Sequence, residues 1–260
     1  MKGHLTFLGT GTSQGIPIPA CSCSVCQSVD SKDNRLRSSV LMEIAGKNFC
    51  IDTGPDFRQQ VLREKVKHLD AVLYTHEHRD HISGLDDIRA FNYQSKGTIP
   101  LYAPSEVIDA LHQSYPYIFE SNYPGIPKVQ VIEIVENPFI IEGIEIIPIP
   151  VYHYRLRVFG YRIGNLAYIT DAKTVPESSR SLIRGIDTLI LNCLHESPHI
   201  SHFNLEEASA FIEDVQPKVT YLTHISHHFG THLEIQKKLP KNVFAAYDGL
   251  RVIFETIRNL

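Results

Sequence analysis

Ten short apolar runs recur along the whole chain, and each has the length of a β-strand. Most are rich in Val, Ile, Tyr or Phe, the residue types that favour strands. The runs cover 4–8, 40–44, 49–51, 71–74, 129–135, 144–149, 166–169, 188–191, 219–222 and 252–254. Apolar residues at helical spacing lie between some of them, at 55–66, 105–115, 176–184 and 204–215. The pattern predicts an α/β fold.

The composition and the lack of linker segments favour a single domain. The chain has 260 residues, of which 43% are apolar and 21% are charged, and these fractions exclude a disordered, collagen-like or coiled-coil protein. No linker rich in Pro, Gly or Ser and no charge run divides the chain, so we expect a single domain over 1–260. The segment 115–128 is rich in proline and is expected to form an ordered surface loop.

Polar residues that chemistry could use follow five of the expected strands. They are Asp52, His76, His153, Asp171 and His224. If these strands run in the same direction within their sheets, their carboxyl ends meet at one edge. We therefore expect the five side chains to converge on an active site.

The segment Thr-His-Glu-His-Arg-Asp-His at 75–81 places three histidines and a carboxylate directly after one strand. A tight loop turns alternate side chains toward different sides of a pocket, so His76, His78, Asp80 and His81 can hold two cations. Asp80 stands where the zinc-protease pattern His-Glu-x-x-His needs its second histidine, which excludes that pattern. The alternative is a solvated polar loop whose side chains pair only by hydrogen bonds.

Three of the five cysteines, Cys21, Cys23 and Cys26, lie within six residues. In a reducing compartment such a cluster favours metal binding over a disulfide. Three thiolates are one ligand short of a closed tetrahedral zinc site, so a fourth must come from elsewhere; the alternative is three unliganded surface thiols. Cys50 and Cys193 stand alone in apolar stretches and are expected in the core.

The order His-x-His-x-Asp-His at 76–81 resembles the signature of the metallo-β-lactamase superfamily, and the other polar strand ends stand in that superfamily's order from 5 to 249. The resemblance implies a four-layer αββα sandwich of two mixed sheets flanked by helices. It also implies a dinuclear site, in which Asp52 would brace the signature loop, although an ordinary turn aspartate would occupy the same place. The implied ligands are His76, His78 and His153 for the first cation, Asp80, His81 and His224 for the second, and Asp171 for both.

Three further segments are similar to the phosphoribosyl cyclic phosphodiesterase (PhnP-like) subfamily: the glycine-rich stretch 9–15, the cysteine trio, and 222–227. This resemblance implies a structural zinc whose fourth ligand is His227. It also aligns His202 with a histidine that faces the substrate phosphate as an acid or a clamp; the alternative is an exposed histidine before a helix. Gln14 replaces the third glycine of a Rossmann fingerprint, so 9–15 is expected to form a tight turn near the site.

We therefore expect a dinuclear metal-dependent phosphodiesterase that cleaves a small or cyclic phosphodiester by metal-bound hydroxide. Its cofactors would be two Zn²⁺ or Mn²⁺ ions and one structural Zn²⁺. Asp80 and His202 are the expected catalytic residues, and Arg155 or Arg157 would offset charge. Three alternatives stay open: a tRNA 3′-end-processing nuclease, a thioesterase or lactonase, and a non-catalytic metal-stabilised binding protein. The net charge of −4 and the lack of a basic arm disfavour nucleic acid.

No apolar run approaches the roughly 18 residues of a membrane-spanning helix. The first ten residues also lack the apolar core of a signal peptide. We expect a soluble, cytoplasmic enzyme with a small-molecule substrate and no membrane partner, and a homodimer stays open.

Overall fold

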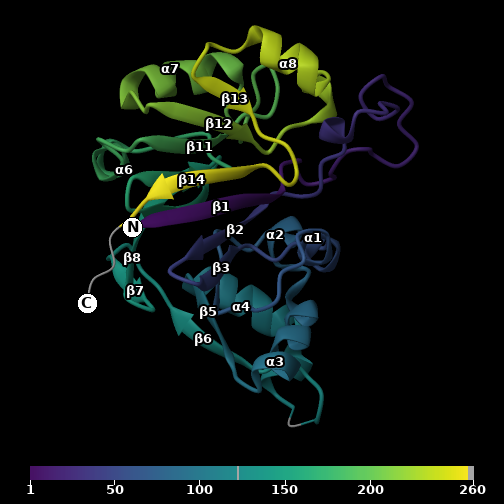
Figure 1. Cartoon of the computed structure of the whole chain (residues 1–260), viewed down its shortest axis with the longest axis vertical. Helices are drawn as coiled ribbons and strands as arrows, with labels where there is room; N and C mark the ends of the chain where they lie inside the picture. Colours follow the sequence, from purple (N-terminus) through teal and green to yellow (C-terminus); the bar gives the residue numbers. More distant parts are fainter. Residues whose placement is uncertain (122, 257–260) are drawn as a thin grey trace.

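Two seven-stranded sheets pack face to face in the computed structural model, which describes residues 1–121 and 123–256 (Figure 1). The first sheet has the order β14-β1-β2-β3-β4-β5-β6, and the second has the order β13-β12-β11-β10-β9-β8-β7. The strands of the first sheet are β1 (Lys2–Gly9), β2 (Ser39–Ile44), β3 (Lys47–Ile51), β4 (Ala71–Leu73), β5 (Ile99–Ala103), β6 (Val129–Glu133) and β14 (Arg251–Glu255). Those of the second sheet are β7 (Phe139–Ile141), β8 (Ile144–His153), β9 (Leu156–Ile163), β10 (Leu166–Ile169), β11 (Thr188–Asn192), β12 (Val219–Thr223) and β13 (Val243–Ala245).

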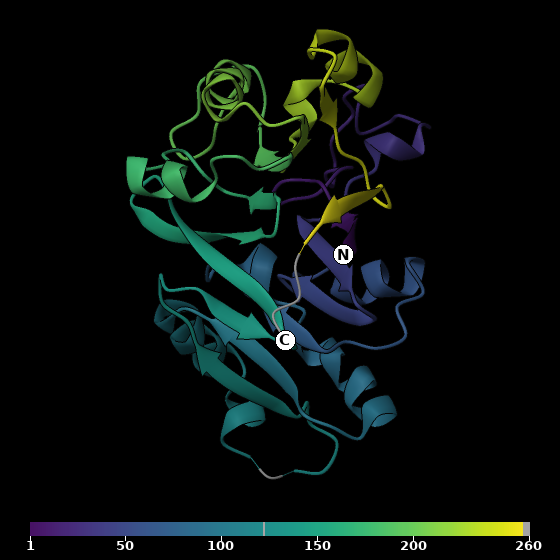
Figure 2. The ribbon, with the colours of Figure 1, turned by 60° about the vertical axis from the view of Figure 1, so that its left-hand side comes forward.

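Helices cover the outer face of each sheet (Figure 2). Along the first sheet lie α1 (Phe57–Arg63), α2 (Arg79–Ile82), α3 (Arg89–Ser95), α4 (Ser105–Ser114) and α5 (Pro116–Phe119). Along the second lie α6 (Glu177–Leu182), α7 (Leu205–Val215) and α8 (His232–Lys238). Short 3-10 turns occur at Ser31–Asp33, Leu85–Ile88 and His227–Phe229.

Each sheet buries apolar side chains on both of its faces, because successive strand residues point to opposite faces of a sheet. Val40 of β2 and Tyr168 of β10 lie in the core between the sheets. Their neighbours Leu41 and Ile169 lie in the two outer cores, beneath the helices. Both sheets mix parallel and antiparallel pairs. The expected four-layer αββα sandwich is confirmed.

The strand directions bring the polar strand ends together. Strands β3 and β4 are parallel, as are β10, β11 and β12. Strand β8 is antiparallel to β9, which is antiparallel to β10, so β8 runs in the same direction as β10. The carboxyl ends of β3 and β4 therefore share one edge of the first sheet, and those of β8, β10 and β12 share one edge of the second.

Every expected strand and helix is present, but four strands and four helices were not predicted. Strand β9 carries Arg157, Gly160 and Arg162 among its apolar residues, and β5 contains Pro100, so neither forms an apolar run. The segment 115–128, expected as a loop, begins with one helical turn, α5, that has proline at its first position. Among the described residues, no helix is long and apolar enough to cross a membrane.

Candidate metal centre

The connection from β4 to α2 presents four of the expected residues. His76 lies fully buried in the loop, and His78 precedes the first residue of α2. Asp80 and His81 project from the single turn of α2, where a carboxylate is favoured by the helix dipole. The ring centroid of His76 lies 4.5 Å from that of His78 and 4.2 Å from that of His81.

Asp52, directly after β3, braces this loop. Its fully buried carboxylate accepts hydrogen bonds from the backbone N–H and the hydroxyl of Thr75, both at 2.8 Å. It also lies 2.7 Å from Nδ1 of His81. A carboxylate on Nδ1 fixes the orientation of an imidazole and leaves Nε2 to face the other way. Burial raises the pKa of Asp52, although the neighbouring His81 acts in the opposite direction.

Asp171, two residues beyond the end of β10, lies among imidazoles from three distant segments. Its Oδ2 is 3.4 Å from Nε2 of His81 and 3.3 Å from Nδ1 of His224. Its Oδ1 is 3.9 Å from Nδ1 of His202. A carboxylate whose two oxygens face different imidazoles is suited to bridge two cations.

His153 closes the side of the centre formed by β8. Its ring centroid lies 5.1 Å from that of His78 and 5.9 Å from that of His76. Nδ1 lies 2.8 Å from the backbone carbonyl of Ser201, a pure acceptor, so the ring donates its proton there. The unprotonated Nε2 is then free to act as a ligand.

Two groups of ligand atoms are compact enough for an ion at this edge, and within each group the atoms lie within 4.8 Å of one another. The groups are His76, His81 and Asp171, and His153, Asp171 and His202. Both contain Asp171, as a bridging role requires. The pairing differs from the implied split, since His81 groups with His76 and His202 groups with His153. His78, Asp80 and His224 surround the same centre outside these compact groups.

Most of these imidazoles have lowered pKa values. Burial lowers the pKa of His76 well below its usual value and also lowers the pKa of His224. His78 is more exposed, and partial desolvation together with the neighbouring His153 lowers its pKa. Burial acts in the same direction on His81, but Asp171 and the other nearby carboxylates raise the pKa of His81 well above its usual value. Because neutral imidazole is the form that binds metals, three of these rings are ready as ligands and His81 must lose a proton.

Five buried histidine ring nitrogens make no hydrogen bond within the described chain, and three of them lie at this edge: Nε2 of His76, Nε2 of His81 and Nδ1 of His202. The other two, Nδ1 of His4 and Nδ1 of His195, lie outside the ligand groups. An unsatisfied buried polar atom costs about 1–3 kcal/mol, so such atoms are rare outside functional sites. The three at this edge belong to the two compact groups. A cation bound there would be the missing partner of Nε2 of His76 and Nε2 of His81.

His202 is buried between two of the expected ligands. Its ring centroid lies 4.4 Å from that of His153 and 4.7 Å from that of His224. His202 lies three residues before α7, and a capping box between Asn204 and Glu207 fixes the first turn of that helix. His202 is 7% exposed, so the alternative of an exposed histidine does not describe it. Burial lowers its pKa to about 2.

Two hydroxyl groups that contact the ring of His224 were not predicted from the sequence. Thr12 Oγ1 lies 3.0 Å from Nε2 of His224, and Ser38 Oγ lies 3.2 Å from Nδ1. Thr12 belongs to the glycine-rich turn, whose backbone was expected near the site, so its position could have indicated the contact. Nothing in the sequence around Ser38 marks it.

The cysteine trio lies against His227. The three sulfur atoms of Cys21, Cys23 and Cys26 lie 3.4, 3.3 and 3.5 Å from Nδ1 of His227. Tetrahedral zinc with ordinary bond lengths would place sulfur and nitrogen ~3.6 Å apart. A hydrogen bond from the backbone N–H of Cys26 lowers the pKa of Cys23 to about 6, whereas burial raises that of Cys26 to about 11. The loop after β1 thereby meets the segment before α8 (Figure 1).

The two candidate arginines have different surroundings. Arg157 lies 3.2 Å from Glu106 and 3.3 Å from Glu136, so carboxylates already neutralise its charge. Arg155 instead lines a hollow of about 560 Å³ that also reaches His78 and His153. Arg155 is therefore the arginine that shares a hollow with two of the expected ligands.

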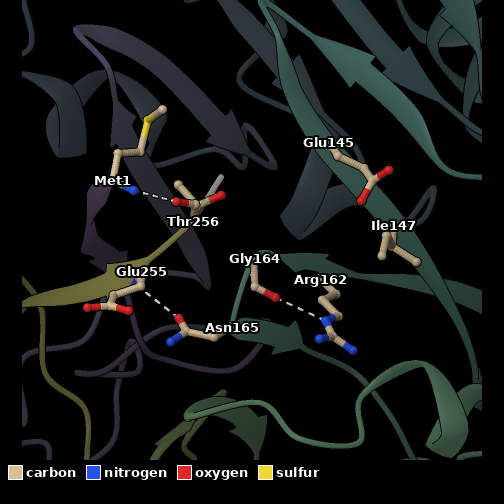
Figure 3. Close-up of a pocket in the computed structure, with 8 residues that line it drawn as sticks. All are labelled: Met1, Glu145, Ile147, Arg162, Gly164, Asn165, Glu255 and Thr256. Carbon is tan, nitrogen blue, oxygen red and sulfur yellow. Dashed lines mark hydrogen bonds between the residues drawn. The ribbon is translucent and has the colours of Figure 1, made fainter. Parts of the chain in front are cut away.

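A separate hollow of about 520 Å³ lies where Met1 contacts Thr256, just after β14 (Figure 3). There the amino group of Met1 donates to the carbonyl of Thr256, and Arg162 donates to the carbonyl of Gly164. Asn165 accepts from the backbone N–H of Glu255. None of the described residues that line it belongs to a ligand group, so it lies apart from the candidate centre.

Known proteins are similar to this chain over most of its length. A model of the "Beta-lactamase superfamily domain" matches residues 47–225. An octanoyltransferase of Porphyromonas gingivalis is 38% identical over 96% of this chain, which spans about half (51%) of that relative's length. Ribonuclease Z of Bacillus subtilis is 26% identical over 96% of this chain and 98% of its own. The crystal structure of a new diphosphatase from the PhnP family superposes with a TM-score of 0.93, with 40% identity and 98% of each chain covered. The resemblance inferred from the 76–81 motif is confirmed.

Proposed function

Since the chain belongs to the β-lactamase superfamily, we propose that it is a metal-dependent hydrolase with a dinuclear centre that cleaves a small phosphodiester or diphosphate. The observation that carries the proposal is Asp171, whose carboxylate is shared by both compact ligand groups. Two divalent cations in such a site lower the pKa of a water and stabilise charge that develops on phosphoryl oxygens.

The side chains fit such cations. Imidazole and carboxylate ligands suit Zn²⁺ and Mn²⁺, and His76, His81 and Asp171 each offer a ligand atom that lies within 4.8 Å of the other two. We assign His76, His78 and His153 to one cation, Asp80, His81 and His224 to the other, and Asp171 to both. Asp80 supports this split because its carboxylate lies 3.2 Å from Nε2 of His81.

The remaining side chains would orient the ligands and the substrate. Asp52 holds the ring of His81, and the carbonyl of Ser201 holds the ring of His153. Nδ1 of His202 is buried and unpartnered, so the ring has a free nitrogen for the substrate. Because burial lowers the pKa of this ring to about 2, the ring is neutral before substrate binds and would hold a phosphoryl oxygen by a hydrogen bond from its N–H. It would donate a proton to the leaving oxygen where the negative charge of a bound substrate raises that pKa.

The similarity to a diphosphatase at 40% identity supports a phosphoester substrate. A tRNA-processing nuclease is the first alternative, because ribonuclease Z matches most of the chain, but the net charge of −4 disfavours it. An acyl ester or thioester is the second alternative. It is raised by the octanoyltransferase, half of which the chain matches.

A hydrolysis panel tests the proposal. The Zn²⁺- or Mn²⁺-loaded protein is assayed on a cyclic phosphodiester, bis(p-nitrophenyl) phosphate, a dinucleoside diphosphate, a lactone, octanoyl thioester and precursor tRNA. We expect hydrolysis of phosphodiesters or the diphosphate, and its loss in Asp171→Asn but not in the surface control Asp214→Asn. Cleavage of only the acyl esters or only the tRNA would replace the proposal by the corresponding alternative.

We also propose that Cys21, Cys23, Cys26 and His227 bind a structural zinc. Four ligands leave no open position on tetrahedral zinc, which suits a structural rather than a catalytic role. Hydrogen bonds from the backbone N–H of Ile18 to Cys26 and of Cys26 to Cys23, both at 3.4 Å, would stabilise thiolate charge there.

A further inference from the structure

The hollow beside the candidate centre has one wall that the proposed chemistry does not use. His78 and His153 line it together with Tyr154, Arg155 and Ile200. A phosphoryl group held at the two histidines would leave the rest of the substrate beside the other three side chains. The side chains there therefore bear on which substrate fits.

Tyr154 is held in an unusual conformation at this wall. It lies in the two-residue turn between β8 and β9, where His153 pairs with Leu156. Its φ is 57°, a left-handed value that a bulky residue rarely adopts. The side chain remains 51% exposed, so packing against the core does not explain the residue type. A two-residue hairpin turn requires such backbone, but it favours glycine or asparagine and does not call for a tyrosine.

Arg155 and Ile200 complete the wall. The guanidinium of Arg155 lies 5.2 Å from the centre of the Tyr154 ring, within the range of a cation–π contact. Among the described residues, no carboxylate lies within ion-pair distance of Arg155, unlike Arg157 on the next strand. Ile200 is 66% exposed on the other lining segment. An exposed ring, an exposed aliphatic side chain and an unpaired positive charge thus surround one hollow.

We propose that this hollow binds the planar ring of a nucleotide-like phosphate ester, with Tyr154 as the residue that selects the ring. The inference rests on the proposed function, since it places the phosphate at His78 and His153. Stacking of a base on an aromatic side chain strengthens binding by about 10-fold or more and needs no particular base. Arg155 attracts the anion whatever group the phosphate carries, because charge attraction does not depend on the ring.

Calorimetric titration of the metal-loaded protein with adenosine 5′-monophosphate and with methyl phosphate tests this inference. We expect the nucleotide to bind about 10-fold more tightly than methyl phosphate. Tyr154→Ala should remove most of this preference without changing the affinity for methyl phosphate, and Tyr154→Phe should keep it. Arg155→Gln should weaken both ligands by a similar factor of a few fold, less at high salt.

Tyr154→Gly adds a readout that does not depend on a ligand. Glycine tolerates the left-handed turn, so this variant should melt a few degrees higher than the wild type while it loses the nucleotide preference. Tyr93→Ala on α3 and Arg251→Gln on β14 are controls outside the hollow and should change neither affinity. Equal binding of the two ligands by the wild type, or a preference that survives in Tyr154→Ala, would overturn the inference. Hydrolysis of methyl p-nitrophenyl phosphate, measured separately, reports on the proposed function alone.

Discussion

Three residues of the candidate centre adopt left-handed backbone just beyond a strand. Asp52, Asp171 and His224 have φ values of 63°, 53° and 56°. Such residues cost about 1–3 kcal/mol each and persist only where their surroundings hold them. Thr75 holds Asp52, and Thr12 holds His224. The sharp turn lets each side chain leave its strand and point along the sheet edge toward the centre.

Asp52→Asn tests whether this carboxylate positions a ligand. The amide keeps the size of the side chain but loses one acceptor, so it cannot both bond Thr75 twice and accept from Nδ1 of His81. We expect zinc affinity to fall about 10- to 100-fold, measured by chelator competition. Asp214→Asn, an exposed partner of Arg180, should leave the affinity unchanged. An Asp52→Asn protein with wild-type affinity would make Asp52 an ordinary turn residue.

His202→Ala separates proton donation from phosphate binding. If His202 protonates the leaving oxygen, kcat should fall about 10²- to 10⁴-fold on an unactivated phosphodiester and much less on an aryl ester, with metal content intact. An equal loss on both substrates would assign it to holding the phosphate. Unchanged rates on both would remove His202 from the reaction.

At the scale of elements, the sequence predicts most of the sandwich because apolar strands are easily recognised. Strand β9 escaped prediction because Arg157, Gly160 and Arg162 interrupt its apolar residues, and the pairing of β8 with β9 is a tertiary property. The convergence of Asp52, His76, His153, Asp171 and His224 on one edge was predicted because each lies at or just beyond the end of a strand. Ser38 could not be found, because its contact with His224 joins residues 186 positions apart.

Cys23→Ser tests the proposed zinc site that joins the loop after β1 to the segment before α8. Loss of one thiolate should release one zinc per chain and lower the melting temperature, since metal binding contributes directly to folding. The pH profile of catalysis should change little, because the trio lies apart from Asp171. Elemental analysis and calorimetry measure the two effects, and Cys50→Ala, at a buried thiol outside the trio, should retain every metal. Identical zinc content in Cys23→Ser and the wild type would refute the structural site.

At the scale of the whole molecule, the proposed ligands come from both sheets. His76, His78, Asp80 and His81 follow strand β4 of the first sheet. His153 is the last residue of strand β8 of the second sheet, and Asp171 and His224 follow its strands β10 and β12. Besides the apolar core, cations bound between them would link the two halves of the sandwich. A local reading of the sequence cannot show this link, because it depends on how the two sheets face each other.

Metal removal should therefore destabilise the entire fold as well as abolish activity. A ligand present at 1,000 times its Kd stabilises the native state by about 4 kcal/mol, and each kcal/mol shifts the melting temperature of a chain this size by roughly 2–4 °C. Chelation should thus lower the melting temperature by roughly 10 °C or more, and Zn²⁺ should restore it with a logarithmic dependence on concentration. In the Cys23→Ser variant, the fall in melting temperature that chelation still causes should come from the dinuclear centre. Adding Asp171→Asn to this variant should therefore abolish most of that fall. If the double variant responds to chelation as strongly as Cys23→Ser alone, the cations do not link the sheets through Asp171.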